Sequence, residues 1–466
     1  MTTASAASAT RPTVSATTAT AIVVADMVGV GVFTSLGFQV KDISSGFALL
    51  LLWIVGGIVA LCGAAAYSEL AGMFPRSSGE YNFLARSFHP AIGFMAGWLS
   101  ATVGFSAPIA LAAMTFGAYF RAAIPNMPPV AFNIGDFAVT WELILGLGVA
   151  WGIALVHLRG LRAGGVFHNI WTTIKLALIM AFLVAGFMAA NPQPISFAPS
   201  AHDFTYVATA PFAISLVFVM YSYSGWNAAT YIAGEVQDPQ RNLPRALIIG
   251  TLIVLALYVA LNAVFLRVTP LDKLAGQLDV AVVAGRYIFG DVGGRVVGGL
   301  ICLGLVSSIS AMTWIGPRVT MTMGEDIPTL RIFARMTRNG VPAWAILFQL
   351  LVVNLLLLTR SFEAIVDFIG FSLTACSFLA VVGVIKLRLT HPELPRPYRA
   401  WGYPLTPAVF LAVTGFMMYY LIVSRPVQSL AGFAMMLAGL AIYAASHLKS
   451  SAPSSSPSVV ENVNRA

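Results

Sequence analysis

Long apolar segments recur along the whole chain, and this feature limits the possible folds more than any other. Many of them run for about 18 residues or more, the length that a helix needs to cross a hydrocarbon core of roughly 30 Å. Only 9% of the 466 residues are charged, and 58% are hydrophobic. Soluble domains average about 25% charged residues, so this chain cannot form a water-compatible surface. The sequence predicts an all-α polytopic membrane protein.

Apolar segments between charged or proline-rich breaks predict twelve transmembrane helices. The expected ranges are 18–38, 47–73, 91–122, 139–158, 165–189, 207–234, 244–266, 294–317, 342–359, 363–389, 404–423 and 428–447. With the N-terminus inside, the cytoplasmic segments hold 17 basic residues and the outer segments hold 8. Basic residues concentrate in cytoplasmic loops. We therefore predict that the protein lies in a plasma or inner membrane and that both of its termini face the cytoplasm.

The remaining segments have simpler interpretations. Residues 1–17 and 450–466 are expected to be disordered cytoplasmic extensions, and the outer loop 268–293 to hold a short amphipathic helix over the entrance. The net charge of +8 is attributed to basic loops rather than to nucleic-acid binding. Cys62, Cys302 and Cys376 lie in apolar segments without metal-site spacing. Because no cysteine falls in an outer loop, a disulfide-linked partner is not expected.

Two of the predicted helices are interrupted near their middles by small residues. The first helix contains Gly29 and Gly31, and the sixth contains Gly225 within the segment 221–227 (Tyr-Ser-Tyr-Ser-Gly-Trp-Asn). A single glycine pair also suits close helix packing. Breaks offset by five helices, however, occupy equivalent places in two halves of opposite topology, and such pairs indicate a transporter's binding site.

Broken helices suit a zwitterionic substrate. The N-terminal end of a half-helix attracts a carboxylate, and the C-terminal end attracts an ammonium group. Two broken helices that lie antiparallel can therefore hold the backbone of an amino acid without any charged side chain. This reasoning favours an amino acid carrier.

Ionisable residues inside the membrane are costly and require an explanation. Lys175 lies about ten residues into its helix, near the midplane. It either gains and loses a proton during transport or serves as a permanently charged strut bonded to helix-break carbonyls and hydroxyls. Asp26, just before the first break, either lines the cytoplasmic vestibule or takes part in coupling. Asp367 is expected to face the outer vestibule, and three carboxylates near helix ends are expected to be interfacial, namely Glu69, Glu142 and Glu235.

Several motifs, in the same order along nearly the whole chain, resemble those of a known family. They are residues 29–33 (Gly-Val-Gly-Val-Phe), 67–70 (Tyr-Ser-Glu-Leu), 74–81 (Phe-Pro-Arg-Ser-Ser-Gly-Glu-Tyr), 223–246 around Gly225, 316–326 around Arg318 and Asp326, and 395–404 around Tyr398. The chain resembles the amino acid–polyamine–organocation (APC) superfamily, close to bacterial amino acid permeases and L-type amino acid transporters.

The resemblance implies two inverted five-helix repeats of the LeuT type, residues 18–189 and 207–389, followed by helices 11 and 12 at 404–447. It also implies alternating access around a midplane site. The substrate ammonium would meet carbonyls near Met27, Tyr221 and Ser224, and the carboxylate would meet amides near Val30 and Gly31. Tyr221 resembles an aromatic gate on the outer side. The remaining break residues would shape or support the broken helices: Gly29, Gly225, Trp226 and Asn227.

Lys175 resembles a lysine that occupies the place of a sodium ion in sodium-independent members. Its ammonium would bridge carbonyls of helix 1 to hydroxyls of helix 8, with Ser307, Ser308 and Ser310 as candidates, which argues against sodium coupling. At Val30 many relatives carry serine, so this chain keeps the amide but lacks one polar contact.

We expect a neutral amino acid substrate, because no acidic residue other than Asp26 lies near the break, with proton symport or exchange as the driving mode. A polyamine or other organic amine is the alternative substrate, and a transport-inactive amino acid sensor is the alternative role. An intramembrane enzyme would need convergent catalytic residues, and the sequence shows no such arrangement. A channel would need a continuous polar stripe, whereas the midplane breaks lead instead to a closed pocket. The sequence indicates no cofactor, no metal and no obligate protein partner.

Overall fold

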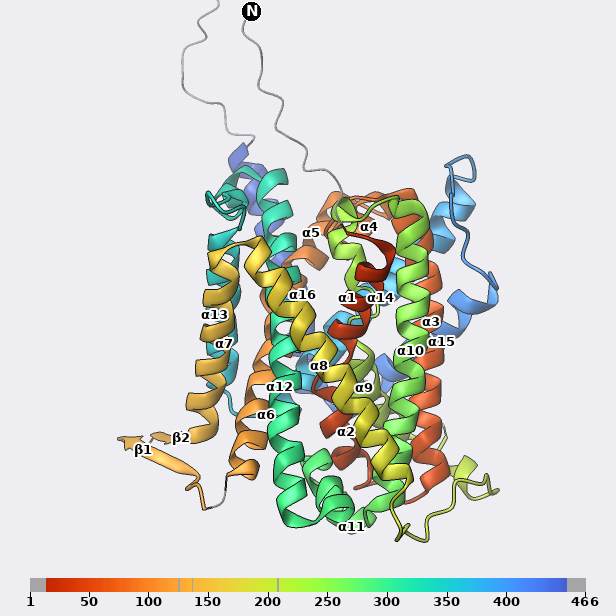
Figure 1. The fold of residues 1–466 in the computed structure, drawn as a ribbon. Helices are drawn as coiled ribbons and strands as arrows, with labels where there is room; N and C mark the ends of the chain where they lie inside the picture. The colour runs from red at the N-terminus through yellow and green to blue at the C-terminus, as the bar shows by residue number, and fades with distance from the viewer. Residues whose placement is uncertain (1–13, 125, 136, 208, 451–466) are drawn as a thin grey trace, which may run out of the picture.

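The computed structural model describes residues 14–124, 126–135, 137–207 and 209–450, and nearly all of its regular structure is helical (Figure 1). The α-helices are α1 (Ala16–Met27), α2 (Gly31–Gln39), α3 (Gly46–Met73), α4 (Glu80–Ser87), α5 (Pro90–Leu99), α6 (Ser106–Ala123), α7 (Trp141–Arg159), α8 (Leu161–Phe187), α9 (Ala210–Tyr223), α10 (Pro239–Val268), α11 (Leu271–Leu274), α12 (Val280–Asp326), α13 (Ala343–Leu357), α14 (Phe362–Thr390), α15 (Leu405–Ser424) and α16 (Pro426–Ser450). Shorter elements are a π-helical turn, η1 (Ser100–Gly104), the 3-10 segments η2 (Asp203–Thr205), η3 (Ala228–Glu235) and η4 (Pro328–Ala334), and a hairpin of β1 (Val130–Ile134) and β2 (Phe137–Thr140).

Each of the twelve predicted segments contains a helix, and the protein is an all-α polytopic membrane protein. Within the described residues, 10 helical spans are long and apolar enough to cross a membrane. Two predicted segments fall short of that length. Helix α13 has 15 residues, and α9 has 14 because it is the first half of a broken helix.

Helix α12 differs most from its expected range of 294–317. It begins at Val280, turns at Gly290 (φ 75°), and continues past Pro317 to Asp326. The predicted outer loop, 268–293, therefore holds less free chain than expected, with the four-residue α11 and the start of α12 in place of one short helix. Val280, Val282 and Ala284 are buried, so the apolar character of this stretch reflects packing rather than a surface position.

The hairpin of β1 and β2, helix α4 and the π-helical turn η1 were not predicted from the sequence. The two strands pair antiparallel, and exposed apolar side chains such as Phe132 and Ile134 project from β1. Helix α4 is short and bears charges at both ends, Glu80 and Arg86, so it lacks the apolar run by which the other helices were recognised.

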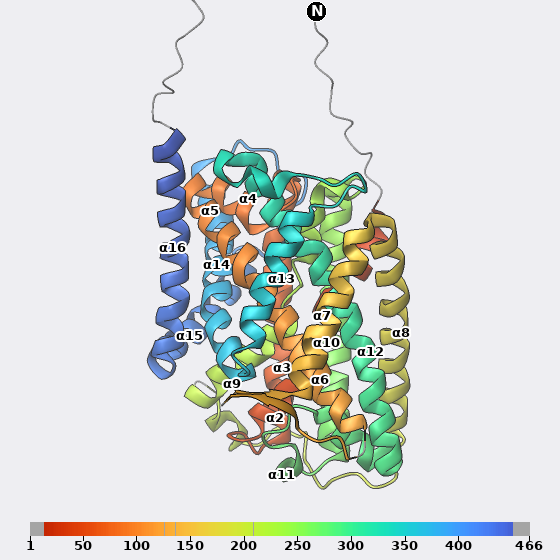
Figure 2. The same ribbon diagram turned by 90° about the vertical axis from the view of Figure 1, so that its left-hand side faces the viewer.

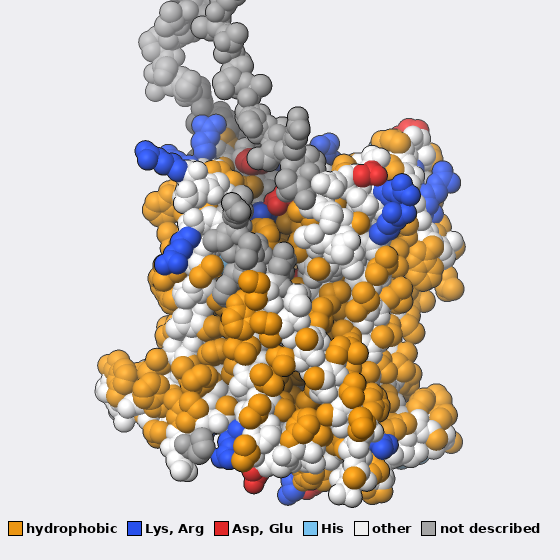
Figure 3. Space-filling model, viewed as in Figure 1, with side chains coloured by type: hydrophobic (Ala, Val, Ile, Leu, Met, Phe, Trp, Pro, Cys, Tyr) orange, Lys and Arg blue, Asp and Glu red, His pale blue; other side chains and the backbone are white. Residues whose placement is uncertain are grey.

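The surface matches a protein that spans a membrane. Figure 3 shows a broad zone of hydrophobic side chains around the middle, with lysine, arginine, aspartate and glutamate gathered at the two ends. The start of α1 and the end of α16 lie at the same end of the molecule (Figures 1 and 2). This placement agrees with an even number of crossings.

The two broken helices lie against each other at the centre. Helix α1 contacts η3, and α2 contacts α9. The first half of each broken helix therefore touches the second half of the other, which means that the two run antiparallel. Helix α10 packs along both α1 and α3, while α12 packs against α6 and α8.

Candidate functional site

The first break separates α1, which ends at Met27, from α2, which begins at Gly31. The amide of Gly29 donates to the carbonyl oxygen of Met27 at 2.7 Å, a tight turn that interrupts the helical hydrogen bonding. A terminated helix leaves its last carbonyl groups without helical partners. These oxygens are available to other donors at the centre of the bundle.

The second break lies at Ser224 and Gly225. Gly225 adopts φ 98°, a conformation that suits glycine. A Cβ at this position would also lie 2.5 Å from Oδ2 of Asp26. The amide and hydroxyl of Ser224 both donate to the carbonyl oxygen of Tyr221, at 3.0 and 2.6 Å. The break therefore depends on a close approach of the two broken helices.

The two breaks are joined by Tyr258 on α10, a residue that the sequence analysis did not single out. Its hydroxyl lies 2.5 Å from the carbonyl oxygen of Met27 and 2.9 Å from that of Ser222. The side chain is fully buried. A buried tyrosine hydroxyl usually has a hydrogen-bond partner. A tyrosine within an apolar predicted helix is therefore the sequence signal that could have identified this residue.

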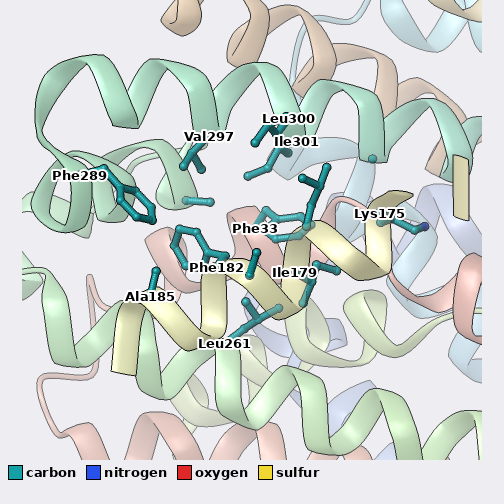
Figure 4. Close-up of a pocket in the computed structure, with 14 residues that line it drawn as sticks. Phe33, Lys175, Ile179, Phe182, Ala185, Leu261, Phe289, Val297, Leu300 and Ile301 are labelled. Atoms are coloured by element: carbon teal, nitrogen blue, oxygen red, sulfur yellow. The ribbon is translucent and has the colours of Figure 1, made fainter. Parts of the chain in front are cut away.

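Lys175 reaches from α8 to the first break. Its ammonium donates to the carbonyl oxygens of Ala25 at 2.9 Å and Val28 at 2.5 Å, and to Oγ of Ser308 at 3.1 Å. Ser308 in turn donates to the carbonyl oxygen of Val28 at 3.0 Å. All three ammonium protons therefore have acceptors. The aliphatic part of Lys175 lines an apolar cavity of about 270 Å³, and its nitrogen points away from that cavity (Figure 4).

The other two candidate serines on α12 contact different side chains. Oγ of Ser307 lies 2.9 Å from Oγ1 of Thr172, and Oγ of Ser310 lies 2.8 Å from Nε2 of His157. Of the three candidate hydroxyls, the structure brings only that of Ser308 to the lysine.

This difference predicts unequal effects of two otherwise similar substitutions. Ser308→Ala removes an acceptor of the charged group and is expected to lower uptake about tenfold, since hydrogen bonds to charged groups are worth about 1.5–3 kcal/mol. Ser307→Ala removes one neutral pair and is expected to change uptake by about twofold or less. Uptake of labelled amino acid into proteoliposomes measures both. Equal losses in the two variants would contradict this assignment.

A cavity of about 110 Å³ lies beside the breaks. Among the predicted residues it is lined by Asp26, Tyr221, Ser224, Gly225, Trp226 and Asn227, but not by Met27, Gly29, Val30 or Gly31. The structure thus places two of the five predicted substrate-binding residues, Tyr221 and Ser224, at the cavity.

Glu80, at the start of α4, also lines this cavity and was not predicted as a site residue. Its Oε1 accepts hydrogen bonds from Tyr67 at 2.5 Å, Ser377 at 2.9 Å and Asn227 at 3.4 Å. The ring of Trp226 packs edge-on against Tyr67, with centroids 4.6 Å apart. Both Trp226 and Asn227 therefore connect the second half of the broken helix to its neighbours.

Side-chain contacts join the helices toward both ends of the molecule. Tyr221 contacts Phe362 edge-on, with centroids 6.3 Å apart. Phe362 also lines a second cavity of about 560 Å³ at the end away from the chain termini. At the opposite end, Arg318 pairs with Glu235 at 2.6 Å and Arg76 pairs with Asp326 at 2.8 Å.

The structure corrects two expectations about carboxylates. Asp367 is 1% exposed and lies 3.3 Å from Nε of Arg425, so it does not face a vestibule. Glu69 is also 1% exposed and pairs with Arg388 at 2.5 Å. It is buried rather than interfacial, because Arg396 and the amide of Ala400, in the loop after α14, also contact its carboxylate at 3.3 and 2.8 Å.

The remaining predicted carboxylates lie near helix ends. Glu142 pairs with Arg121 at 2.5 Å.

The three cysteines are all buried and unpaired.

Comparison with known proteins agrees with this architecture. A family model described as amino acid permease matches residues 14–446. The b(0,+)-type amino acid transporter 1 of Mus musculus is 25% identical over 430 residues, which cover 91% of this chain and 85% of the relative. The large neutral amino acids transporter small subunit 2 of Mus musculus is 26% identical over 428 residues, covering 91% and 78%. This chain therefore belongs to the amino acid permease family, as a multi-pass membrane protein of amino acid transport and not an enzyme.

Proposed function

We propose that this protein carries neutral amino acids across the membrane without sodium, by alternating access and with proton symport or amino acid exchange. The observation that carries the proposal is the position of Lys175. Its ammonium occupies the space between carbonyl oxygens of Ala25 and Val28 and the hydroxyl of Ser308. Oxygen atoms of this kind would otherwise suit a metal cation. A resident ammonium group supplies that charge permanently.

The neutral substrate is supported by the name of one relative, a large neutral amino acids transporter. The scarcity of acidic residues near the break is a weaker reason for a neutral substrate, because Glu80 lies beside Asp26 at the cavity. The same relative is named a small subunit. Since Cys62, Cys302 and Cys376 are all buried, a partner subunit of this chain would be held by noncovalent contacts.

The proposed topology has both termini in the cytoplasm of a cell whose plasma or inner membrane holds the protein. Two inverted repeats, residues 18–189 and 207–389, would precede helices 11 and 12 at 404–447. The antiparallel contact of the two broken helices supports the inverted arrangement. A reporter that fluoresces only in the cytoplasm, fused after residue 466, is expected to fluoresce, and its silence in an expressed fusion would reverse the orientation.

Uptake into proteoliposomes tests the transport function. A panel of radiolabelled amino acids is applied with an inward proton gradient, with a sodium gradient, or with unlabelled amino acid preloaded inside. Accumulation under the proton gradient or stimulation by internal amino acid is expected. Uptake driven by sodium alone would overturn the role proposed for Lys175.

A second candidate substrate class, polyamines, is favoured by one observation. Asp26 and Glu80 place two carboxylates at one cavity, and a diamine carries two cationic nitrogens but no carboxylate. Putrescine and spermidine therefore belong in the same panel. Uptake of either one, without uptake of any amino acid, would give this class precedence.

A further inference from the structure

The cavity at the helix breaks contains an imbalance of charge. Asp26 and Glu80 both line it, and they are 4% and 3% exposed. No lysine, arginine or histidine is among the described residues that line it. Uncompensated charge is costly to bury, so the two carboxylates need a positive partner.

Lys175 supplies one counter-charge, and that charge is fixed. Its ammonium interacts electrostatically with Asp26. Because three acceptors already hold its protons, loss of a proton would leave a buried oxygen without a donor. Such a loss is unfavourable. Lys175 therefore acts as a strut that balances one of the two carboxylates.

Glu80 has no cationic partner among the described residues, and its two oxygens differ. Tyr67, Ser377 and Asn227 all donate to Oε1. Within the described part of the chain, Oε2 accepts no hydrogen bond. A proton can therefore bind at Oε2 while the three contacts at Oε1 remain in place. Across the cavity, the buried Oδ1 of Asp26 also lacks a partner in the described structure, which adds to the unmet demand for positive charge.

We propose that Glu80 carries the transported proton, at Oε2, and that one proton accompanies each neutral amino acid. This inference rests on the proposed amino acid transport. A zwitterion brings no net charge, so the centre made of Lys175, Asp26 and Glu80 keeps one net negative charge when substrate binds. The added proton cancels it before the centre passes through the closed state. Glu80 takes up the proton while the cavity opens to the outside and releases it toward the cytoplasm.

Of the two carboxylates, Asp26 faces Lys175, whose charge favours its ionised form, whereas Glu80 faces no cation among the described residues. Around Glu80 the titratable neighbours are Tyr67 on α3, Tyr231 on η3 and Cys376 on α14. Around Asp26 they are Lys175 on α8, Tyr231 on η3 and Tyr258 on α10. Tyrosine and cysteine ordinarily lose protons only above neutral pH. They therefore stay protonated while Glu80 changes state.

The decisive experiment compares Glu80→Gln with wild type in proteoliposomes that contain a pH-sensitive dye. The labelled probe is the neutral amino acid that wild type takes up fastest. Glutamine keeps an oxygen for the Oε1 donors but cannot bind the proton. The variant is expected to lose proton-driven accumulation and internal acidification at least tenfold, yet to retain exchange against internal amino acid. Glu393→Gln, in an exposed cytoplasmic-end loop, is the matched control and is expected to behave as wild type.

A milder variant keeps the proposal testable if Glu80→Gln does not fold. Ser377→Ala removes one donor to the charged form of Glu80, so proton affinity rises and the midpoint of the pH profile moves up by about one pH unit. A purely structural role would lower the rate without moving the midpoint. Proton-coupled accumulation that survives in Glu80→Gln, or an unmoved midpoint in Ser377→Ala, would overturn the proposal. A wild type that transports amino acid without proton movement would reject coupling itself and leave amino acid exchange standing.

Discussion

Lys175→Met is expected to reduce uptake to about one hundredth of wild type, because buried groups left without a partner cost about 1–3 kcal/mol each. Methionine matches the aliphatic part of the lysine side chain, which lines the apolar cavity, and fills irregular apolar space, so packing there is preserved. The carbonyl oxygens of Ala25 and Val28 would lose their ammonium donor at the first break. Uptake in proteoliposomes and thermal stability in detergent measure the two consequences.

A matched lysine outside the site separates this effect from a general loss of charge. Lys386 lies near the end of α14, with its ammonium 4.8 Å from the ring centroid of Phe88. Exposed cation–π contacts are worth about 0.5–1 kcal/mol, and Lys386→Met is expected to keep uptake within about twofold of wild type. If Lys175→Met transports at a similar rate, the ammonium is not required at the break.

The helix breaks and the central lysine were accessible to sequence analysis because each violates a local rule of membrane helices. The pair Gly29 and Gly31 and the single Gly225 each interrupt an apolar run, and the charge of Lys175 stands alone within another. Both signals lie within a few neighbouring residues. The contact of Lys175 with Ser308 followed from the resemblance, which offered three serines without deciding among them.

The residues that the sequence missed depend on contacts between distant segments. Glu80 meets Asn227 and Ser377 across 147 and 297 residues of chain, and Tyr258 meets Met27 across 231 residues. Glu80 belongs to a loop motif, and its position in the sequence gives no indication that α4 turns inward. Asp367 was misplaced for the same reason, since its partner Arg425 follows α15.

Gly31→Ala is expected to abolish detectable uptake and to lower thermal stability, because α2 and α9 meet at this glycine. A Cβ at position 31 would lie 2.3 Å from Oγ, 2.5 Å from Cα and 2.6 Å from Cβ of Ser222. Rotation of the serine relieves only the contact with Oγ, so the two helices must separate. Overpacking of this kind costs about 1–3 kcal/mol or more, and it also disturbs the hydroxyl contact of Ser35 with Ser222 at 3.0 Å.

Gly29→Ala provides the control within the same break. A Cβ there would meet Oγ of Ser308 at 3.6 Å, an ordinary van der Waals contact, and Gly29 is not among the glycines with positive φ. Uptake is therefore expected to stay within about threefold of wild type, since well-tolerated small changes cost under about 1 kcal/mol. Equal loss in both variants would mean that the break needs backbone freedom at each glycine. Loss confined to Gly31→Ala would mean that close approach of the antiparallel half-helices is what the glycine pair provides.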